Sequence, residues 1–193
     1  MDKNDLDLWQ EDAIAFYFQN KENGSPSILK DATIAFIKGL KMRFPEFLES
    51  YCGDIKELIK TKYAGLDHTD TREHLQIEAL LNFCQQAVDI DEDLSANGFL
   101  PIIEQEITSN YEFDHILKKR VVHILISISY QLSKIEDKKY IHFIIQKCVE
   151  MLINTTDGCL KLCCIQFFIE FFNNYYLERD AYAEYVTPIF ETS

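Results

Sequence analysis

Residues 114–133 read DHILKKRVVHILISISYQLS, an apolar run with three consecutive cations, Lys118, Lys119 and Arg120, in front of it. The run predicts a long, largely buried helix. Cations near the N-terminal end of a helix oppose its dipole, so we ask whether they serve a membrane, a nucleic acid or a protein partner. The apolar stretch 121–130 is interrupted by His and Ser and is shorter than the roughly 20 residues that span a bilayer. We therefore expect no membrane partner.

The composition predicts a helical protein that does not bind nucleic acid. Hydrophobic residues make up 47% of the chain, against only 6 glycines and 4 prolines, which disfavours both disorder and a turn-rich β-sandwich. The net charge of −13 opposes binding to a phosphate backbone and favours a basic partner. The N-terminal stretch MDKNDLDLWQED is acidic and lacks the apolar segment of a signal peptide, so we do not expect export.

The sequence offers no constellation of catalytic residues. It contains no phosphate-binding glycine loop, no G-x-S-x-G and no H-E-x-x-H. The six cysteines form no C-x-x-C pair and lie in apolar, helix-like surroundings, which favours buried reduced thiols over disulfides or zinc ligands. His68 and His74, with Asp67 and Asp70, could form a metal site, but a polar turn is the simpler interpretation. We expect no enzymatic activity, no metal and no cofactor.

A repeat of about 44 residues organises the chain. Long apolar helices are predicted to begin near residues 27, 71, 114 and 158, at spacings of 44, 43 and 44 residues, and a second helix follows each of them. Two-helix units of about 40 to 47 residues are typical of HEAT and armadillo arrays, in which each pair buries its apolar face against neighbouring pairs. The repeat predicts an all-α, right-handed superhelix (solenoid) of about four HEAT-like helix pairs. An ordinary helical bundle is the alternative.

The expected boundaries assign outer and inner helices to each pair. Residues 1–193 are predicted to form a single array, with an N-terminal extension and loop over 1–26 and stacked pairs over 27–193. Helices 27–44 and 181–191 lack a partner, so we expect a piece of a longer array, or a neighbour that covers both ends. The complete pairs are 45–62 with 71–88, 94–107 with 114–132, and 138–152 with 158–174.

Each later inner helix opens with an aspartate that is followed by basic residues. In HEAT repeats such acids and bases stack as a ladder along the array. The separation here varies from two to six residues, so the recurrence supports the ladder more than any single match does. The aspartates could instead cap their helices and complement the dipoles. The predicted ladder comprises Asp70, Arg72, Asp114, Lys118, Lys119, Arg120, Asp157 and Lys161.

An acidic segment separates Arg72 from Lys118. It holds ten acidic residues and no Lys or Arg. Such a segment would attract a basic cargo segment through long-range electrostatics, although charge runs are more often solvated turns. The candidate partner-binding residues are Asp89, Asp91, Glu92, Asp93, Glu104 and Glu106.

Four stretches resemble importin-β (karyopherin-β) nuclear transport receptors. DLDLWQEDAIAFY is similar to their W-x-E-D-P-x-x-F stretch, with Trp9, Glu11 and Asp12 matching and Ala13 where proline is usual. FLPIIEQEI resembles an L-L-P-E-L outer helix, and LKKRVVHILISISYQLS resembles the inner helix R-R-R-V-I-W-L-I-G-Q-W. EYVTPIFET resembles the outer helix x-F-L-P-Y-L-E that follows. The order and spacing are most similar to the importin eleven branch of the family, with the exportin-two branch next.

The resemblance implies a non-enzymatic segment that binds protein cargo during nucleocytoplasmic transport. It implies Ran-GTP regulation through other repeats of the intact protein, nucleoporins as further partners, and movement between cytoplasm and nucleus through the pore. The family's Ran-contact repeats find no match in this chain. The alternative is a HEAT-repeat scaffold or adaptor subunit that organises an enzyme or a vesicle coat.

Overall fold

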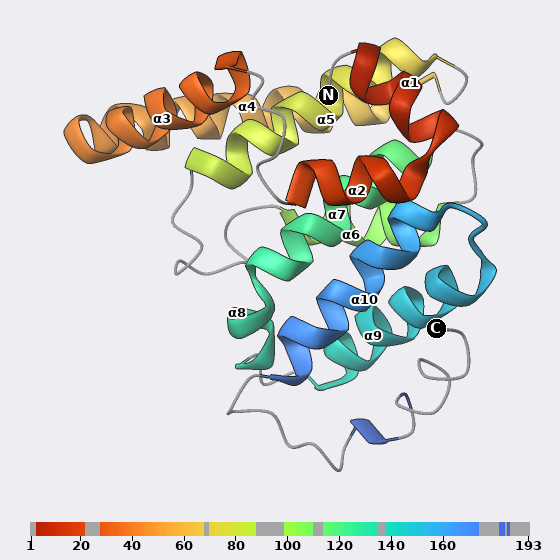
Figure 1. Cartoon of the computed structure of the whole chain (residues 1–193). Coiled ribbons are helices and arrows are strands. Elements are labelled where there is room, and N and C mark those ends of the chain that lie inside the picture. The colour runs from red at the N-terminus through yellow and green to blue at the C-terminus, as the bar shows by residue number, and fades with distance from the viewer. Residues whose placement is uncertain are drawn as a thin grey trace. The chain divides into compact units, whose positions relative to one another are not determined.

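The structure, a computed structural model, describes residues 3–21, 28–67, 70–87, 99–109, 114–134, 138–173, 182–183 and 185. Within these residues every long element is a helix and no strand occurs (Figure 1). The all-α prediction is confirmed. The chain divides into two compact units, Met1–Asp89 and Ile90–Ser193, and each is described by itself. The prediction of one continuous array over 1–193 stays a prediction.

The first unit contains five helices among its described residues. Helices α3, α4 and α5 pack against one another, and α1 packs against α2. Pro45 begins α4 directly after Arg43 and Phe44, as proline does at a first helical position. The helices are α1 (Lys3–Glu11), α2 (Ala13–Lys21), α3 (Ile28–Arg43), α4 (Pro45–Ala64) and α5 (Thr71–Ala87).

The N-terminal segment is more regular than the predicted extension and loop over 1–26. Helices α1 and α2 meet at Asp12, whose carboxylate accepts a hydrogen bond from the backbone N–H of Ala15 at 2.9 Å. The buried rings of Trp9 and Phe16 stack with their centroids 5.4 Å apart. This aromatic contact joins the two short helices, which are too short to be stable alone.

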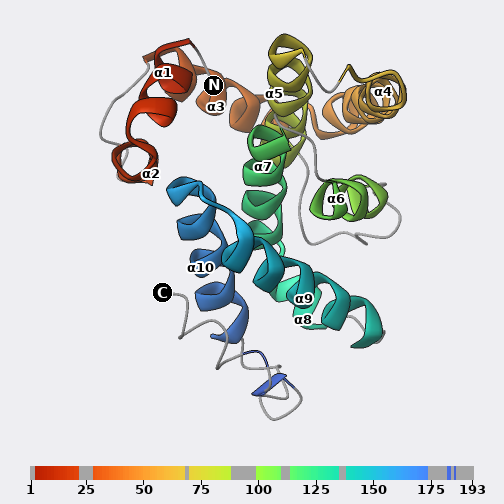
Figure 2. The same cartoon turned by 90° about the vertical axis from the view of Figure 1, so that its right-hand side faces the viewer.

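The second unit consists of two helix pairs in contact, as Figures 1 and 2 show. Helix α6 packs on α7 and α9 packs on α10. In addition α6 packs on α9, and α7 packs on α10. The helices are α6 (Phe99–Thr108), α7 (Asp114–Ser127), α8 (Ser129–Ser133), α9 (Lys138–Asn154) and α10 (Gly158–Phe172).

Helices α7 and α10 supply much of the core of this unit. Leu117, Val121 and Leu125 on α7 are fully buried, as are Phe167 and Phe171 on α10. Residues three or four positions apart share one helix face, so each set forms a continuous apolar stripe. This spacing explains why the run after the cations folds as a helix that is covered by protein.

The predicted helix 114–132 is distorted at Ile128, the residue between α7 and α8. Helical hydrogen bonds continue across this residue, because the N–H of Ile128 donates to the Ile124 carbonyl oxygen at 3.0 Å and the N–H of Leu132 donates to the Ile128 carbonyl oxygen at 2.9 Å. Beside it, the Ser127 hydroxyl donates a hydrogen bond to the His123 carbonyl oxygen at 3.0 Å. Such a bond from a serine to the preceding turn tends to bend a helix.

The other predicted boundaries lie within a few residues of the helices α3, α4, α5, α9 and α10. The predicted helix 94–107 corresponds to α6 from Phe99 on, and 94–98 lie outside the described residues. Most of the predicted helix 181–191 also lies outside them. In the part of the chain that the structure describes, each helix is too short or too polar to cross a membrane.

Candidate functional site

A polar pocket of about 360 Å³ lies in the second unit, where α6 and α9 end and α7 and α10 begin. Ile107, Met151 and Leu160 supply apolar parts of its wall. The remaining lining residues are polar and come from α6, α7 and α9 and from the residues that follow α6 and α9: Thr108, Ser109, His115, Lys118, Lys147, Glu150, Asn154 and Thr155. The pocket is the candidate site because it gathers charged groups from both helix pairs.

Lys118 ties the beginning of α7 to the end of α6. Its Nζ donates a hydrogen bond to the backbone carbonyl of Ser109, which directly follows α6. The Ser109 hydroxyl in turn donates to the Glu106 carbonyl oxygen at 2.9 Å. The last carbonyl groups of a helix lack partners within the helix and carry partial negative charge. The cation that opposes the dipole of α7 therefore complements the C-terminal end of α6.

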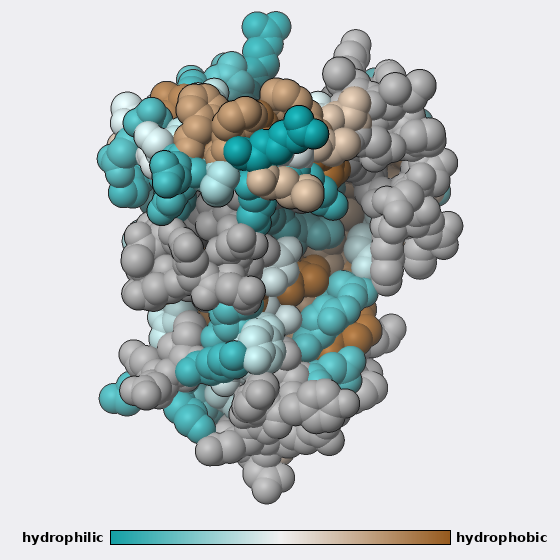
Figure 3. All heavy atoms as spheres, turned by 90° about the vertical axis from the view of Figure 1, so that its left-hand side faces the viewer, coloured by the Kyte–Doolittle hydropathy of each residue, from teal (hydrophilic) through white to brown (hydrophobic). Residues whose placement is uncertain are grey.

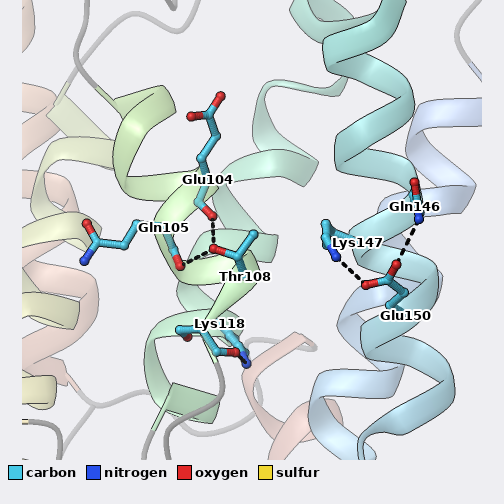
Figure 4. Close-up of polar contacts among 8 residues, drawn as sticks. Glu104, Gln105, Thr108, Lys118, Gln146, Lys147 and Glu150 are labelled. Carbon is cyan, nitrogen blue, oxygen red and sulfur yellow. Dashed lines mark hydrogen bonds and ion pairs between the residues drawn. The ribbon is translucent and has the colours of Figure 1, made fainter.

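Lys147 and Glu150, both on α9, form an ion pair at the pocket. Lys147 Nζ lies 2.6 Å from Glu150 Oε2, and Gln146 Nε2 donates to Glu150 Oε1 at 3.0 Å (Figure 4). The hydrogen bond from Lys147 is the main cause that lowers the pKa of Glu150 below its usual value. Both charges are partly exposed, so their attraction is weakened by solvent.

This arrangement can bind polar groups of another molecule. Two ammonium groups, one carboxylate and several hydroxyl or amide groups converge on a space that suits one or two amino-acid side chains. Among the described residues, no group of three His, Cys, Asp or Glu side chains is placed to hold a metal ion. The pocket can therefore offer hydrogen-bond donors and acceptors of both charges to another molecule.

Two of the three ladder aspartates cap helices. The Asp157 carboxylate accepts a hydrogen bond from the backbone N–H of Leu160 at 2.8 Å, at the beginning of α10. The Asp70 carboxylate accepts from the backbone N–H of Arg72 at 2.8 Å, at the beginning of α5. The side chain of Asp114 lies outside the described residues. The capping alternative thus has direct support at two positions.

The basic members of the predicted ladder are half-buried or exposed. Arg72 is exposed, and Lys119, Arg120 and Lys161 are half-buried. Among the described residues the Lys161 side chain makes no ion pair. Lys118 contacts a backbone carbonyl. The continuous ladder stays a prediction.

The six acidic residues predicted to bind a partner have three different outcomes in the structure. Asp89, Asp91, Glu92 and Asp93 lie outside the described residues. Glu104 is exposed and its carboxylate points away from α6 (Figure 4), so it is available to a partner. Glu106 is only 1% exposed. Its assignment as a partner-binding residue is corrected, because it shares the buried face of α6 with Ile102 and Ile103.

Five cysteines are buried free thiols: Cys52, Cys148, Cys159, Cys163 and Cys164. On α10, Cys159 and Cys163 hydrogen-bond to each other, and this bond is the main cause that raises the pKa of the Cys163 thiol. The same bond lowers the pKa of Cys159, with a smaller contribution from the positive charge of Lys119. Burial raises the pKa of Cys164 to about 12. These thiols pack in the core and do not line the pocket.

Sequence reasoning missed the pocket and the Lys147–Glu150 pair. The signal was the three-residue separation of an acid and a base on one helix, which places the two side chains on the same face. That separation is common on solvated helices, so it identifies a site only once α6 and α9 are placed side by side.

Comparison with protein families, curated proteins and solved structures finds no match for this chain.

Proposed function

We propose that this chain is a non-enzymatic protein-binding segment built from stacked HEAT-type helix pairs. The observation that carries the proposal is the packing of α6, α7, α9 and α10. Each of these helices contacts its partner within a pair and the corresponding helix of the other pair. In a solenoid every repeat buries its apolar face in this way against its neighbours.

The packing agrees with the period of the sequence. Helices α7 and α10 begin at residues 114 and 158, one period apart, and they are in contact. Their outer partners α6 and α9 are in contact as well. In the first unit, α4 and α5 form the corresponding pair and α3 packs on both. A right-handed superhelix of about four such pairs is the arrangement that we propose for the whole chain.

We further propose that the segment belongs to a nuclear transport receptor of the importin-β type. This proposal rests on the sequence resemblance of the WQEDAIAF stretch, in which Trp9 and Phe16 are buried and stacked and Asp12 caps the second helix. In this role the segment would bind cargo with basic segments through exposed acids such as Glu104. Ran-GTP and nucleoporins would bind other repeats, and the protein would move between cytoplasm and nucleus.

The test is a binding experiment with the full-length protein and purified Ran. We expect the protein to bind Ran loaded with a non-hydrolysable GTP analogue and to release it when Ran carries GDP. Equal binding of both forms, or binding of neither, would contradict the transport role. Ran with GDP is the matched control, because the two forms differ only in the nucleotide and in the conformation that the nucleotide selects.

A further inference from the structure

The first unit carries an apolar stripe on the outer face of α4. We define the α4 stripe as Phe44, Phe47, Tyr51 and Leu58, whose side chains are 57%, 61%, 48% and 44% exposed. Positions 47, 51 and 58 share one helix face, since their separations match whole turns of the helix. Figure 3 shows apolar side chains at the surface near the junction of α3 and α4. Exposed apolar side chains that gather on one helix face mark an interaction site more often than scattered single residues do.

The stripe is held in place by the core of the same unit. The rings of Phe47 and Tyr51 stack with centroids 6.2 Å apart, and Tyr51 meets the edge of Phe83 on α5 at 5.7 Å. Phe83 packs against the buried cluster of Ile37, Leu48 and Cys52. The aromatic side chains of the α4 stripe are therefore ordered before a partner binds, which reduces the conformational entropy lost on binding. Rigid aromatic anchors are typical of the residues that dominate binding energy.

Acidic side chains lie within the stripe and beside it. Asp54 occupies the same helix face between Tyr51 and Leu58, and Glu57 and Glu46 lie along one margin. Among the described residues neither Asp54 nor Glu46 has an ion-pair partner. Two nearby bases are already engaged, because Lys60 contacts Glu57 at 2.7 Å and Lys62 donates to Gln76 on α5 at 2.9 Å.

We infer that the α4 stripe is a docking surface for a basic amphipathic helix of a partner protein. An apolar face with residues at helical spacing would cover Phe47, Tyr51 and Leu58, and Lys or Arg side chains of the same helix would pair with Asp54 within the stripe and with Glu46 beside it. Charge complementarity selects this occupant over a second copy of the chain. In a twofold pairing of the stripe with itself, Asp54 would face the carboxylates of the other copy, which repel it.

The inference goes beyond transport and needs only the folded first unit. The experiment measures fluorescence anisotropy of a labelled helical peptide of about 20 residues, with leucines on one face and lysines at its margins, titrated with the full chain. A second peptide keeps the leucines and replaces each lysine with glutamate. We expect the chain to bind the lysine peptide at least about tenfold more tightly, and the preference to weaken as salt is raised.

Three variants locate the binding on the stripe. Leu58→Ser is expected to weaken binding of the lysine peptide about tenfold, and Asp54→Lys to reduce or reverse the preference between the two peptides. Ile169→Ser is the matched control, because Ile169 on α10 is also exposed, at 50%, but lies in the other unit. It should bind as the unchanged chain does.

The inference is overturned if the lysine peptide does not bind, if the two peptides bind equally, or if Leu58→Ser and Ile169→Ser behave alike. It is also overturned if the chain dimerises in sedimentation equilibrium and Leu58→Ser abolishes the dimer, because the stripe would then be occupied by a second copy. These results do not depend on Ran. A negative Ran experiment with positive peptide binding would reject transport and retain the docking surface.

Discussion

The Sγ atom of Cys163 on α10 lies 3.6 Å from Nε2 of His123 on α7. This contact lies between the two helices that supply much of the core of the second unit, and the thiol itself is fully buried. It joins residues 40 positions apart in the sequence. Burial and the hydrogen bond with Cys159 favour the neutral form of this thiol, and only the thiolate is an effective nucleophile.

We therefore predict that Cys163 is protected from alkylation in the folded protein. Its pKa is raised by the hydrogen bond with Cys159 and by burial, and reagents cannot reach it without local opening. Iodoacetamide should modify it at least about a hundredfold more slowly than a surface thiol. Peptide mass spectrometry measures the rate, and Ile169→Cys provides an exposed reference thiol on the same helix. Equal rates for the two thiols would contradict the buried arrangement.

Cys164 makes the stability of the second unit sensitive to alkaline pH. Burial raises its pKa from 9.0 to about 12, so between these values the unfolded chain loses the proton while the folded chain keeps it. Because the unfolded state then binds fewer protons, stability falls as pH rises. The protonated Cys164 thiol makes its full contribution to stability below pH 9, and this contribution is lost progressively toward pH 12.

The measurement is urea unfolding at pH 8 and at about pH 10.5. Over this interval the free energy of unfolding of the unchanged chain should fall by about 2 kcal/mol more than that of Cys164→Ala, which has no thiol to titrate at this position. Cys164→Ala lowers stability at both pH values because it leaves a cavity, so the comparison concerns the pH dependence and not the absolute value. The same pH dependence in both proteins would show that the thiol does not contribute.

Asp157 is predicted to stabilise α10 through its cap. The Asp157→Ala change removes the acceptor for the backbone N–H of Leu160, and we expect the free energy of unfolding to fall by about 1 kcal/mol. Asp157→Asn keeps an oxygen in the same place and should cost much less, which separates the hydrogen bond from the charge. Urea unfolding followed by circular dichroism measures both. If Asn and Ala are equally destabilising, the negative charge at the helix end matters more than the cap.

The helices could be predicted because their signals are local. Pro45 begins α4 and Asp157 begins α10 in the positions that proline and a capping aspartate favour. The apolar spacing of Val121 and Leu125 defines a buried face without knowledge of what covers it. The distortion at Ile128 was not predicted, because the bond from Ser127 to the preceding turn is one of several that a serine can make in a helix.

The pocket and the burial of Glu106 could not be predicted in the same way. Both depend on which helices come together, and in the sequence Glu106 resembles exposed Glu104 two positions away. A two-residue step rotates a side chain by about 200° around the helix, so one faces the core and the other solvent. The partner of Lys118 is a backbone carbonyl. Every residue has a backbone carbonyl, so the sequence does not identify this partner. Charge patterning alone therefore favoured aspartate as the partner.

The last prediction compares two cations that the ladder hypothesis treats as equivalent. Lys118→Met keeps the apolar part of the side chain and removes the ammonium group that binds the Ser109 carbonyl at the end of α6. We expect the free energy of unfolding to fall by about 1 kcal/mol, since the bond is charge-assisted but borders an open pocket. Lys161→Met should change it by less than about 0.5 kcal/mol, because the Lys161 side chain makes no ion pair among the described residues.

Urea unfolding at low salt and at about 1 M salt measures both variants. The loss of stability in Lys118→Met should be smaller at high salt, because salt screens the charge. Equal losses in the two variants would favour a continuous ladder over the contact of Lys118 with the end of α6.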